Sequence, residues 1–263
     1  MPNMQDWKPG NIIQAAVIGK SKIGKTWGAG TWPRPNFIDF DGGMATLGQA
    51  AWIAKYGKRS IEYETFYEKT RDSKGVALRH NAFDDACAYF HKWMQPDKRD
   101  QFDTWVIDSA TSLVQAAMNK AIILLGEKAL SVTSQTFDRA KKTGTIYPVI
   151  QDYGAERSMV EQFIQMVKDS GKHVLVLCHE TEQRDENGMI TSIEPLVTGQ
   201  SKEVIPMKFD ELWFLRVVKE GPNIIRYIQT TPDGVRKCGT RLGVPDKTPF
   251  EYEAVVKSLS GGK

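Results

Sequence analysis

The sequence predicts an α/β fold in which a mostly parallel sheet is flanked by helices, with β-hairpins in the C-terminal part. Short apolar runs alternate with segments of helical periodicity over the first 180 residues. Residues 174–178 are apolar throughout, which is typical of a strand covered on both faces. Beyond residue 180, turn signals separate polar runs. Strand–helix alternation favours a parallel sheet, and the later turns favour antiparallel hairpins.

The individual elements follow from the same patterns. Strands are expected at residues 12–18, 36–40, 61–65, 105–107 and 174–178, and helices at residues 82–94, 110–125 and 155–169. One hairpin is expected to turn at Asn187-Gly188, and another at Pro232-Asp233-Gly234 between residues 224–230 and 235–238. Because the sequence has no repeat, low-complexity tract or clear linker, residues 1–263 are expected to form a single domain.

The composition bounds the class of protein. With 263 residues, 41% of them hydrophobic and 25% charged, the chain resembles ordinary soluble globular proteins. A net charge of +3 neither requires nor excludes a polyanionic partner. Three cysteines without CxxC spacing make a zinc site or disulfide framework unexpected. No signal-peptide core or membrane-length apolar run is present, so no membrane contact and a cytoplasmic location are expected.

The strongest motif spans residues 19–26, which match the phosphate-binding pattern G-x-x-x-x-G-K-[ST] at each fixed position. Glycines let the backbone point its N–H groups at phosphate oxygens, and the following helix presents its positive end to the same anion. We expect Lys25 to bind the β- and γ-phosphates and Thr26 to ligate Mg²⁺. A Gly/Lys-rich surface loop is the alternative. The residues predicted to bind ATP are Gly19, Lys20, Ser21, Lys22, Ile23, Gly24, Lys25 and Thr26.

Two features around this loop agree with a nucleotide site. An apolar run precedes the loop, as the motif requires, and Pro33 and Pro35 predict that the following helix lasts only a turn or two. Residues 102–109 form an apolar strand pattern that ends in Asp108, the form of a Walker B strand. At the carboxyl end of its strand, Asp108 would hold Mg²⁺ through water, although many strands end in Asp for capping alone.

Several segments resemble the RecA-like ATPases. Phe37-Ile38-Asp39-Phe40-Asp41-Gly42-Gly43 resembles the second strand of that core, Val106-Ile107-Asp108-Ser109 its Walker B strand, and Val174-Leu175-Val176-Leu177-Cys178-His179 its sensor strand. The resemblance implies a RecA-like P-loop core. It also implies that Asp41, standing where RecA has Glu, polarises the attacking water. His179, standing where RecA has Gln, would sense the γ-phosphate.

More narrowly, the chain is similar to the small phage-encoded RecA-like ATPases of single-strand annealing and recombination. That similarity spans residues 13–245 and implies a cytoplasmic location in a bacterial host cell. It rests on Asp41-Gly42-Gly43, Gln151-Asp152-Tyr153-Gly154, Pro195-Leu196-Val197-Thr198-Gly199, Phe209-Asp210-Glu211-Leu212-Trp213 and Arg241-Leu242-Gly243-Val244-Pro245.

Each candidate catalytic residue also has a plainer interpretation. His179 follows five apolar residues and could be a buried core histidine. Asp41 precedes two glycines and could open an Asx turn. Asp39 points to the other face of its strand and is expected to be structural. Glu180, next to the sensor position, is the alternative catalytic carboxylate.

Arg241 is the candidate arginine finger. RecA-like hydrolysis generally uses a positive charge from a neighbouring subunit, so the resemblance implies a homo-oligomer, either a ring or a filament. The family's Lys-x-Arg element departs here, since position 239 is Gly and the nearest lysine is Lys237. Arg241 could also be an ordinary solvated side chain in a turn-rich segment.

The loop after the Walker B helix, residues 126–151, is the candidate surface for single-stranded DNA. It has four basic residues, Lys128, Arg139, Lys141 and Lys142, against two acidic ones, which suits a backbone-tracking surface or, alternatively, a solvated loop. Residues 180–203, the second loop where RecA-like proteins bind DNA, have two basic residues against six acidic ones, which argues against phosphate contact there.

Three functions are compatible with these residues. The first is an Mg²⁺-dependent ATPase that acts on single-stranded DNA in recombination or annealing, with a single-strand binding or annealing protein as a further partner. The second is a nucleotide-switched loader or assembly ATPase whose partner is a protein. The third is a P-loop kinase, which ranks last because residues 180–203 are acidic and carry one arginine instead of an arginine-rich lid.

Overall fold

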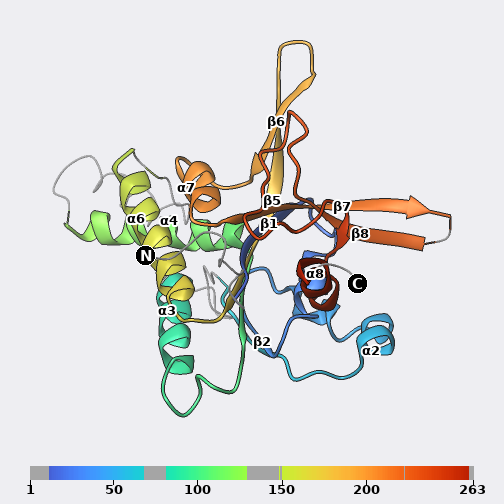
Figure 1. Ribbon diagram of the computed structural model, residues 1–263. Coiled ribbons are helices and arrows are strands. Elements are labelled where there is room, and N and C mark those ends of the chain that lie inside the picture. The colour runs from blue at the N-terminus through green and yellow to red at the C-terminus, as the bar shows by residue number, and fades with distance from the viewer. Residues whose placement is uncertain (1–11, 68–80, 129–147, 149, 222, 261–263) are drawn as a thin grey trace, which may run out of the picture.

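The computed structural model describes residues 12–67, 81–128, 148, 150–221 and 223–260. Its centre is one twisted sheet, in which the six strands from β3 to β7 are parallel and the last two pair antiparallel (Figure 1). The strand order is β3 (Glu62–Thr65), β2 (Pro35–Asp39), β4 (Thr104–Asp108), β5 (His173–Arg184), β1 (Gln14–Gly19), β7 (Glu211–Glu220), β8 (Asn223–Gln229) and β9 (Thr248–Pro249).

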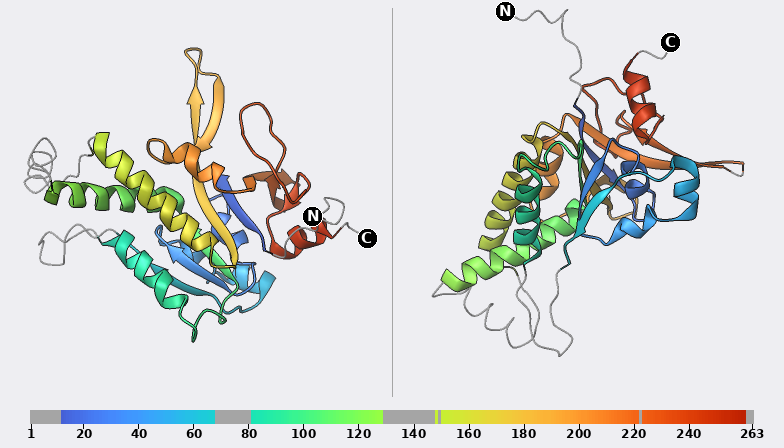
Figure 2. Two further views of the ribbon diagram at one scale, coloured as in Figure 1. Left: turned by 60° about the vertical axis from the view of Figure 1, so that its left-hand side comes forward. Right: turned by 90° about the horizontal axis from the view of Figure 1, so that it is seen from below.

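Helices cover both faces of the sheet (Figure 2). One face carries α3 (Ala82–Trp93), α4 (Ala110–Lys128), α6 (Ile150–Lys168) and α7 (Ser201–Met207). The other carries α1 (Lys25–Ala29), the 3₁₀ turn η2 (Gly43–Thr46), α2 (Ala50–Tyr56) and α8 (Tyr252–Leu259). Strand residues alternate between two cores: Trp105 and Ile107 pack toward the first face, and Val106 between them packs toward the second. The α/β fold predicted from the sequence is confirmed.

The predicted strands and helices lie within a few residues of the observed ones. Pro33 and Pro35 indeed follow a P-loop helix of only five residues, α1. The hairpin predicted at Asn187-Gly188 is confirmed, because β5 continues beyond the sheet and pairs antiparallel with β6 (Ile190–Pro195). This β5–β6 hairpin projects from the rest of the molecule (Figures 1 and 2).

The hairpin predicted at residues 232–234 is wrong. β8 pairs with β7 along its whole length and with β9 at its end, whereas residues 235–238 contribute only isolated bridging contacts. Asp233 accepts hydrogen bonds from the backbone N–H groups of Val235 (3.2 Å) and Arg236 (2.8 Å), so the chain turns away from β8 after the turn. Arg236 then meets Ile193 of β6, and Gly239 meets Leu212 at the start of β7.

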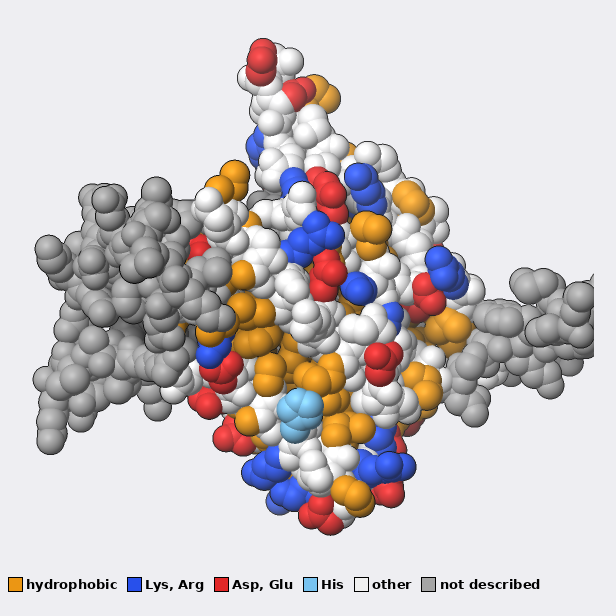
Figure 3. All heavy atoms as spheres, turned by 90° about the vertical axis from the view of Figure 1, so that its left-hand side faces the viewer, with side chains coloured by type: hydrophobic (Ala, Val, Ile, Leu, Met, Phe, Trp, Pro, Cys, Tyr) orange, Lys and Arg blue, Asp and Glu red, His pale blue; other side chains and the backbone are white. Residues whose placement is uncertain are grey.

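The face formed by α3 and α6 is partly apolar. Figure 3 shows exposed hydrophobic side chains gathered between areas of charged side chains. Phe90 of α3, Met94 directly after that helix and Met166 of α6 line a shallow groove between the helices. None of the described helices is long and apolar enough to cross a membrane.

Candidate active site

The phosphate-binding loop connects β1 to α1 and depends on one unusual backbone conformation. Gly24, the residue before the helix, has φ of 106°, a left-handed conformation that strains other residues. A Cβ at this position would also lie 2.3 Å from Nε of Arg226. Glycine is therefore required at this position for two reasons, the left-handed backbone conformation and the close packing against Arg226.

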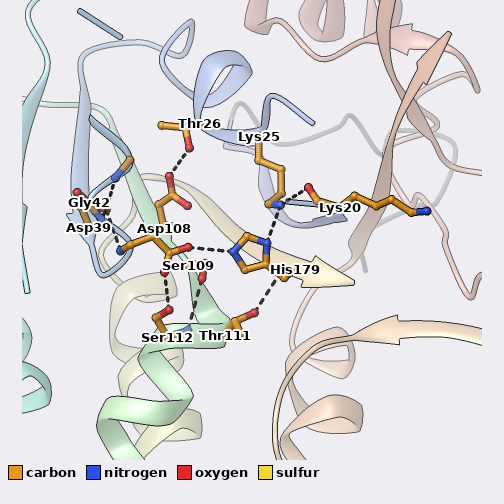
Figure 4. A network of polar contacts seen from close by, with 12 residues as sticks. Lys20, Lys25, Thr26, Asp39, Gly42, Asp108, Ser109, Thr111, Ser112 and His179 are labelled. Carbon is orange, nitrogen blue, oxygen red and sulfur yellow. Dashed lines mark hydrogen bonds and ion pairs between the residues drawn. The ribbon is translucent and has the colours of Figure 1, made fainter. Parts of the chain in front are cut away.

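Lys25 is the first residue of α1, and its side chain is almost fully buried, with 5% exposure. Its three N–H groups donate to the carbonyl oxygens of Gly19 (2.8 Å) and Lys20 (2.9 Å) and to Nδ1 of His179 (3.2 Å) (Figure 4). Burial lowers the pKa of this ammonium, and the nearby Asp108 carboxylate offsets part of that effect. The Lys25 ammonium thus links the end of the loop to its start and holds a positive charge there.

Thr26 and Asp108 lie together at the carboxyl ends of β1 and β4. The Thr26 hydroxyl donates to Oδ2 of Asp108 over 2.5 Å (Figure 4). Burial raises the pKa of Asp108 to about 6, despite the Thr26 hydrogen bond, and the neighbouring Asp41 and Asp39 add to the increase. A cation would favour the charged carboxylate, because an opposite charge lowers the pKa of a carboxyl group.

These two oxygen donors fit Mg²⁺. The ion usually takes one or two protein ligands and fills its remaining positions with water and phosphate oxygens. The described residues contain no group of three or more His, Cys, Asp or Glu side chains arranged around one point, so a metal-binding cage of protein ligands is not found in this part of the chain. Thr26 and Asp108 would hold the ion from one side and leave its other side to the nucleotide.

Asp41 and His179 come from different strands and contact each other. Nε2 of His179 lies 3.0 Å from Oδ2 of Asp41, and Ser112 of α4 donates a short hydrogen bond to the other oxygen (Figure 4). Because Lys25 donates to Nδ1, the neutral imidazole carries its proton on Nε2 and donates it to Asp41. Burial acts to raise the pKa of Asp41, but hydrogen bonds from His179, Ser112 and Ser109 outweigh it and hold that pKa below its usual value.

Asp39 has a structural role, as expected, but through its hydrogen bonds to the turn after β2 and not through the strand face it occupies. Its Oδ1 accepts the backbone N–H groups of Asp41 (3.1 Å), Gly42 (2.8 Å) and Gly43 (3.3 Å), and its Oδ2 accepts the Thr65 hydroxyl (3.0 Å). This carboxylate folds the backbone after β2 into a tight turn. A Cβ on Gly43 would lie 3.4 Å from Oγ1 of Thr26, so the turn brings the backbone against the metal donors.

Glu180 follows His179 on β5 and is held differently from Asp41. Both of its carboxylate oxygens are buried without a hydrogen-bond partner, although the residue as a whole is partly exposed. Its negative charge acts to raise the pKa of Lys25. Asp41, oriented by hydrogen bonds from His179, Ser112 and Ser109, is the better-positioned candidate for a water-binding carboxylate.

Arg241 lies at the opposite edge of the sheet. Its guanidinium pairs with Asp210 (2.7 Å), and its backbone N–H donates to Glu211 (2.7 Å) at the start of β7. Glu211 is level with Ala15 of β1, four residues before Gly19. At about 3.3 Å per residue, that places Glu211 roughly 13 Å from the phosphate loop. Arg241 therefore does not contact its own site, and a role in hydrolysis requires a neighbouring subunit.

The predicted DNA-binding residues cannot be placed. Arg139, Lys141 and Lys142 lie outside the described residues, and only the backbone of Lys128, at the end of α4, lies within them. Their role stays a prediction.

Three side chains at the site were not predicted. Ser112 and Thr111 lie on the first turn of α4, where Thr111 accepts the His179 backbone N–H over 3.2 Å. Their position directly after Asp108 is the one signal in the sequence that places them here. Arg226 of β8 donates from Nε to the carbonyl oxygen of Ile23 in the phosphate loop over 2.9 Å. No motif marks Arg226, because two hundred residues separate it from the loop.

The arrangement combines a phosphate-binding loop, a cationic amine, two oxygen donors that fit a metal ion and an oriented carboxylate. Together these groups can bind a triphosphate, neutralise its charge and direct a water molecule toward the terminal phosphorus. The polar groups converge at the carboxyl ends of parallel strands, where open α/β sheets bind their ligands.

A family model agrees with a P-loop ATPase site of this kind. A family model described as AAA domain matches residues 12–242. A sequence search of curated proteins found no match. Among solved structures, a KaiC-like protein from the archaeon Pyrococcus horikoshii is 12% identical, with a TM-score of 0.41 over 82% of this chain and 77% of that chain. The flagellar accessory protein FlaH from Methanocaldococcus jannaschii is 10% identical, with a TM-score of 0.37 over 84% and 80%.

Proposed function

This chain belongs to the AAA-domain family of P-loop ATPases, and from that premise we propose that it hydrolyses ATP to act on single-stranded DNA in recombination or annealing, as a ring or filament of identical subunits. The observation that carries the catalytic part is the convergence of Lys25, Asp108 and Asp41 at one edge of the sheet. The DNA part is supported by the resemblance to phage-encoded annealing ATPases and by the basic residues Lys128, Arg139, Lys141 and Lys142.

Each residue at the site has a distinct part in the proposed reaction. Water attacks the γ-phosphorus, the bond to the bridging β–γ oxygen breaks, and ADP and inorganic phosphate result. Lys25 neutralises charge on the β- and γ-phosphates. Thr26 and Asp108 would hold Mg²⁺, which would supply further positive charge. Asp41 accepts a hydrogen bond from the attacking water and orients it.

His179 connects the two halves of this chemistry. It contacts Lys25 through one ring nitrogen and Asp41 through the other, over 3.2 and 3.0 Å. A phosphate that draws the Lys25 ammonium toward itself changes the hydrogen bond at Nδ1, and the imidazole transmits that change to Asp41. We propose this as the sensing role of His179.

Arg241 would complete the site of a neighbouring subunit. It projects from the edge opposite its own phosphate loop, and its side chain is 78% exposed. A positive charge presented outward in this way can reach phosphate only in another molecule, which is the reason for proposing a homo-oligomer.

A protein partner is the second candidate function. The projecting β5–β6 hairpin carries Glu182, Asp185, Glu186 and Glu194, with the exposed Met189 near its tip. An acidic arm with an apolar tip repels DNA phosphates and suits a basic protein surface. This observation favours a loader or assembly ATPase over a kinase.

ATP hydrolysis measured with and without single-stranded DNA tests the proposal. We expect stimulation by DNA, together with binding that weakens steeply with salt in fluorescence anisotropy. Changing Lys141 and Lys142 together to Ala should lower affinity and reduce the log–log salt slope by roughly 0.7 per lost contact. The same change at the exposed Lys58 and Lys257 is the matched control. No DNA binding at low salt, with or without a non-hydrolysable ATP analogue, would favour the protein partner instead.

A further inference from the structure

Two side chains beside the phosphate loop have no part in the chemistry described above. Trp27 lies on α1 directly after Thr26, and Arg226 reaches the loop from β8. The Arg226 guanidinium lies over the Trp27 ring, with its central carbon 5.6 Å from the ring centroid. Its Nε donates to the Ile23 carbonyl oxygen over 2.9 Å. Among the described residues, the Ile23 carbonyl is the acceptor to which the Arg226 guanidinium donates.

The Trp27 ring is also held by Tyr56 of α2. Its indole N–H donates to the Tyr56 hydroxyl over 3.3 Å, and that hydroxyl donates to Glu251 over 2.8 Å. The Tyr56 ring meets the indole edge-on, with centroids 6.3 Å apart. Trp27 and Arg226 nevertheless remain partly exposed. They form a braced and partly open surface beside the phosphate loop.

The direction of the bound nucleotide follows from the sheet order. Of the groups expected around the terminal phosphate, Asp41 follows β2, Asp108 ends β4 and His179 lies on β5. These three strands all lie on one side of β1. A nucleotide whose terminal phosphate points to that side extends its nucleoside end to the other side of the loop. There β7 and β8 follow β1 in the sheet, and Arg226 and Trp27 lie between β8 and the loop.

We propose that Trp27 and Arg226 form the nucleoside-binding part of the site, where the indole and guanidinium bind the nucleobase by stacking. This inference rests on the proposed nucleotide-binding function. Aromatic rings and guanidinium planes both stack on nucleobases, and such stacking accepts any base because every base has a π-face. Because a purine has a larger face than a pyrimidine, it should stack more strongly and bind more tightly.

Isothermal titration of the full chain with MgATP and with magnesium tripolyphosphate tests the inference, because tripolyphosphate has the phosphates without the nucleoside. Trp27→Ala should weaken ATP binding by about tenfold, within the ~5–150-fold range for loss of a base-stacking ring, and leave tripolyphosphate binding unchanged. Trp27→Phe, which keeps an aromatic ring, should retain most of the ATP affinity. Arg226→Ala should also weaken ATP binding.

The control is Arg216→Ala. Arg216 lies on β7 one residue before Val217, the partner of Arg226, so it projects from the opposite face of the hairpin and should bind ATP as the parent does. Equal losses of ATP and tripolyphosphate affinity in Trp27→Ala, or no loss of ATP affinity, would overturn the subsite. If the parent chain binds tripolyphosphate no more weakly than ATP, the nucleoside subsite is overturned, but the phosphate-binding site stands. A parent that binds neither would overturn nucleotide binding itself.

Discussion

The two edges of the parallel sheet hold their polar side chains in different ways. At the carboxyl edge, Lys25 and Asp108 are 5% and 3% exposed and belong to a continuous set of contacts with Thr26, Asp41 and His179. At the amino edge, the Arg241 side chain is 78% exposed and its ion pair with Asp210 is open to water. Burial and mutual hydrogen bonds pre-organise the first edge to bind a ligand within the chain, whereas the second edge can present charge only to another molecule.

The largest effect is expected at Lys25. Lys25→Ala removes the buried positive charge of the carboxyl edge and should lower the rate of ATP hydrolysis by roughly 10²–10³-fold, the range for loss of one group that stabilises transition-state charge. The ammonium lies in a polar network outside the apolar core, so thermal denaturation should show a folded variant. Normal turnover in such a folded variant would remove the nucleotide site from this edge.

The two carboxylates at the same edge should separate binding from turnover. Asp41→Asn should bind MgATP as the parent does and lose about 10²-fold in turnover, because a water-orienting group acts in the transition state. Asp108→Asn should instead weaken MgATP binding. Both are measurable by titration and steady-state kinetics.

Asp103→Asn is the matched control for these carboxylates, since Asp103 precedes β4 at the amino edge and pairs with Arg34 over 2.7 Å. Asp103→Asn should change neither the affinity for MgATP nor the rate of turnover. If Asp41→Asn turns over at the parent rate, Glu180→Gln becomes the next variant to test, because Glu180 is the neighbouring carboxylate with unpaired buried oxygens.

A pH dependence should distinguish the buried carboxylate from the hydrogen-bonded one. Mg²⁺ binds the ionised form of Asp108, whose pKa is about 6, so MgATP affinity should fall about tenfold per pH unit below pH ~6. In the absence of metal, the ionisation of Asp108 has the opposite effect on folding stability. The folded-state pKa lies above the usual 3.8, so this group costs stability as pH rises from about 4 to about 6. Asp108→Asn should flatten both profiles. Asp41, with its lowered pKa, should stay ionised throughout.

The smallest effect on nucleotide affinity is expected at the amino edge. Arg241→Ala should leave the Kd for MgATP within about twofold of the parent, since Arg241 is bonded to Asp210 and Glu211, and Glu211 lies roughly 13 Å from the phosphate loop. Its effect on hydrolysis should appear only when subunits assemble. Mixing Arg241→Ala with Lys25→Ala subunits should then restore turnover at the interfaces that combine one intact loop with one intact arginine. A changed Kd in isolated subunits would place Arg241 in its own site.

Local patterns were enough to identify the phosphate loop, its strand and its short helix. Gly24 must adopt a left-handed conformation, and the prolines after α1 stop the helix, so these features depend on neighbours in the chain. Asp39 ends β2 and folds the backbone of the following turn, whereas Asp41 lies in that turn and faces the site. Alternation between apolar runs and helical segments predicted the α/β class for the same local reason.

Only the tertiary structure decided how distant segments meet. A turn signal at residues 232–234 marks a reversal of the chain but does not select its partner. All seven residues of β8 pair with β7, a longer ladder than residues 235–238 could offer. Arg226 reaches the phosphate loop, and Arg241 is carried to the far edge, through strand order alone. Hydrogen bonds and packing between segments about two hundred residues apart leave no local pattern in the sequence. The sequence by itself therefore determined the phosphate loop and the fold class. The order of strands in the sheet decided which charged side chains lie around the nucleotide site.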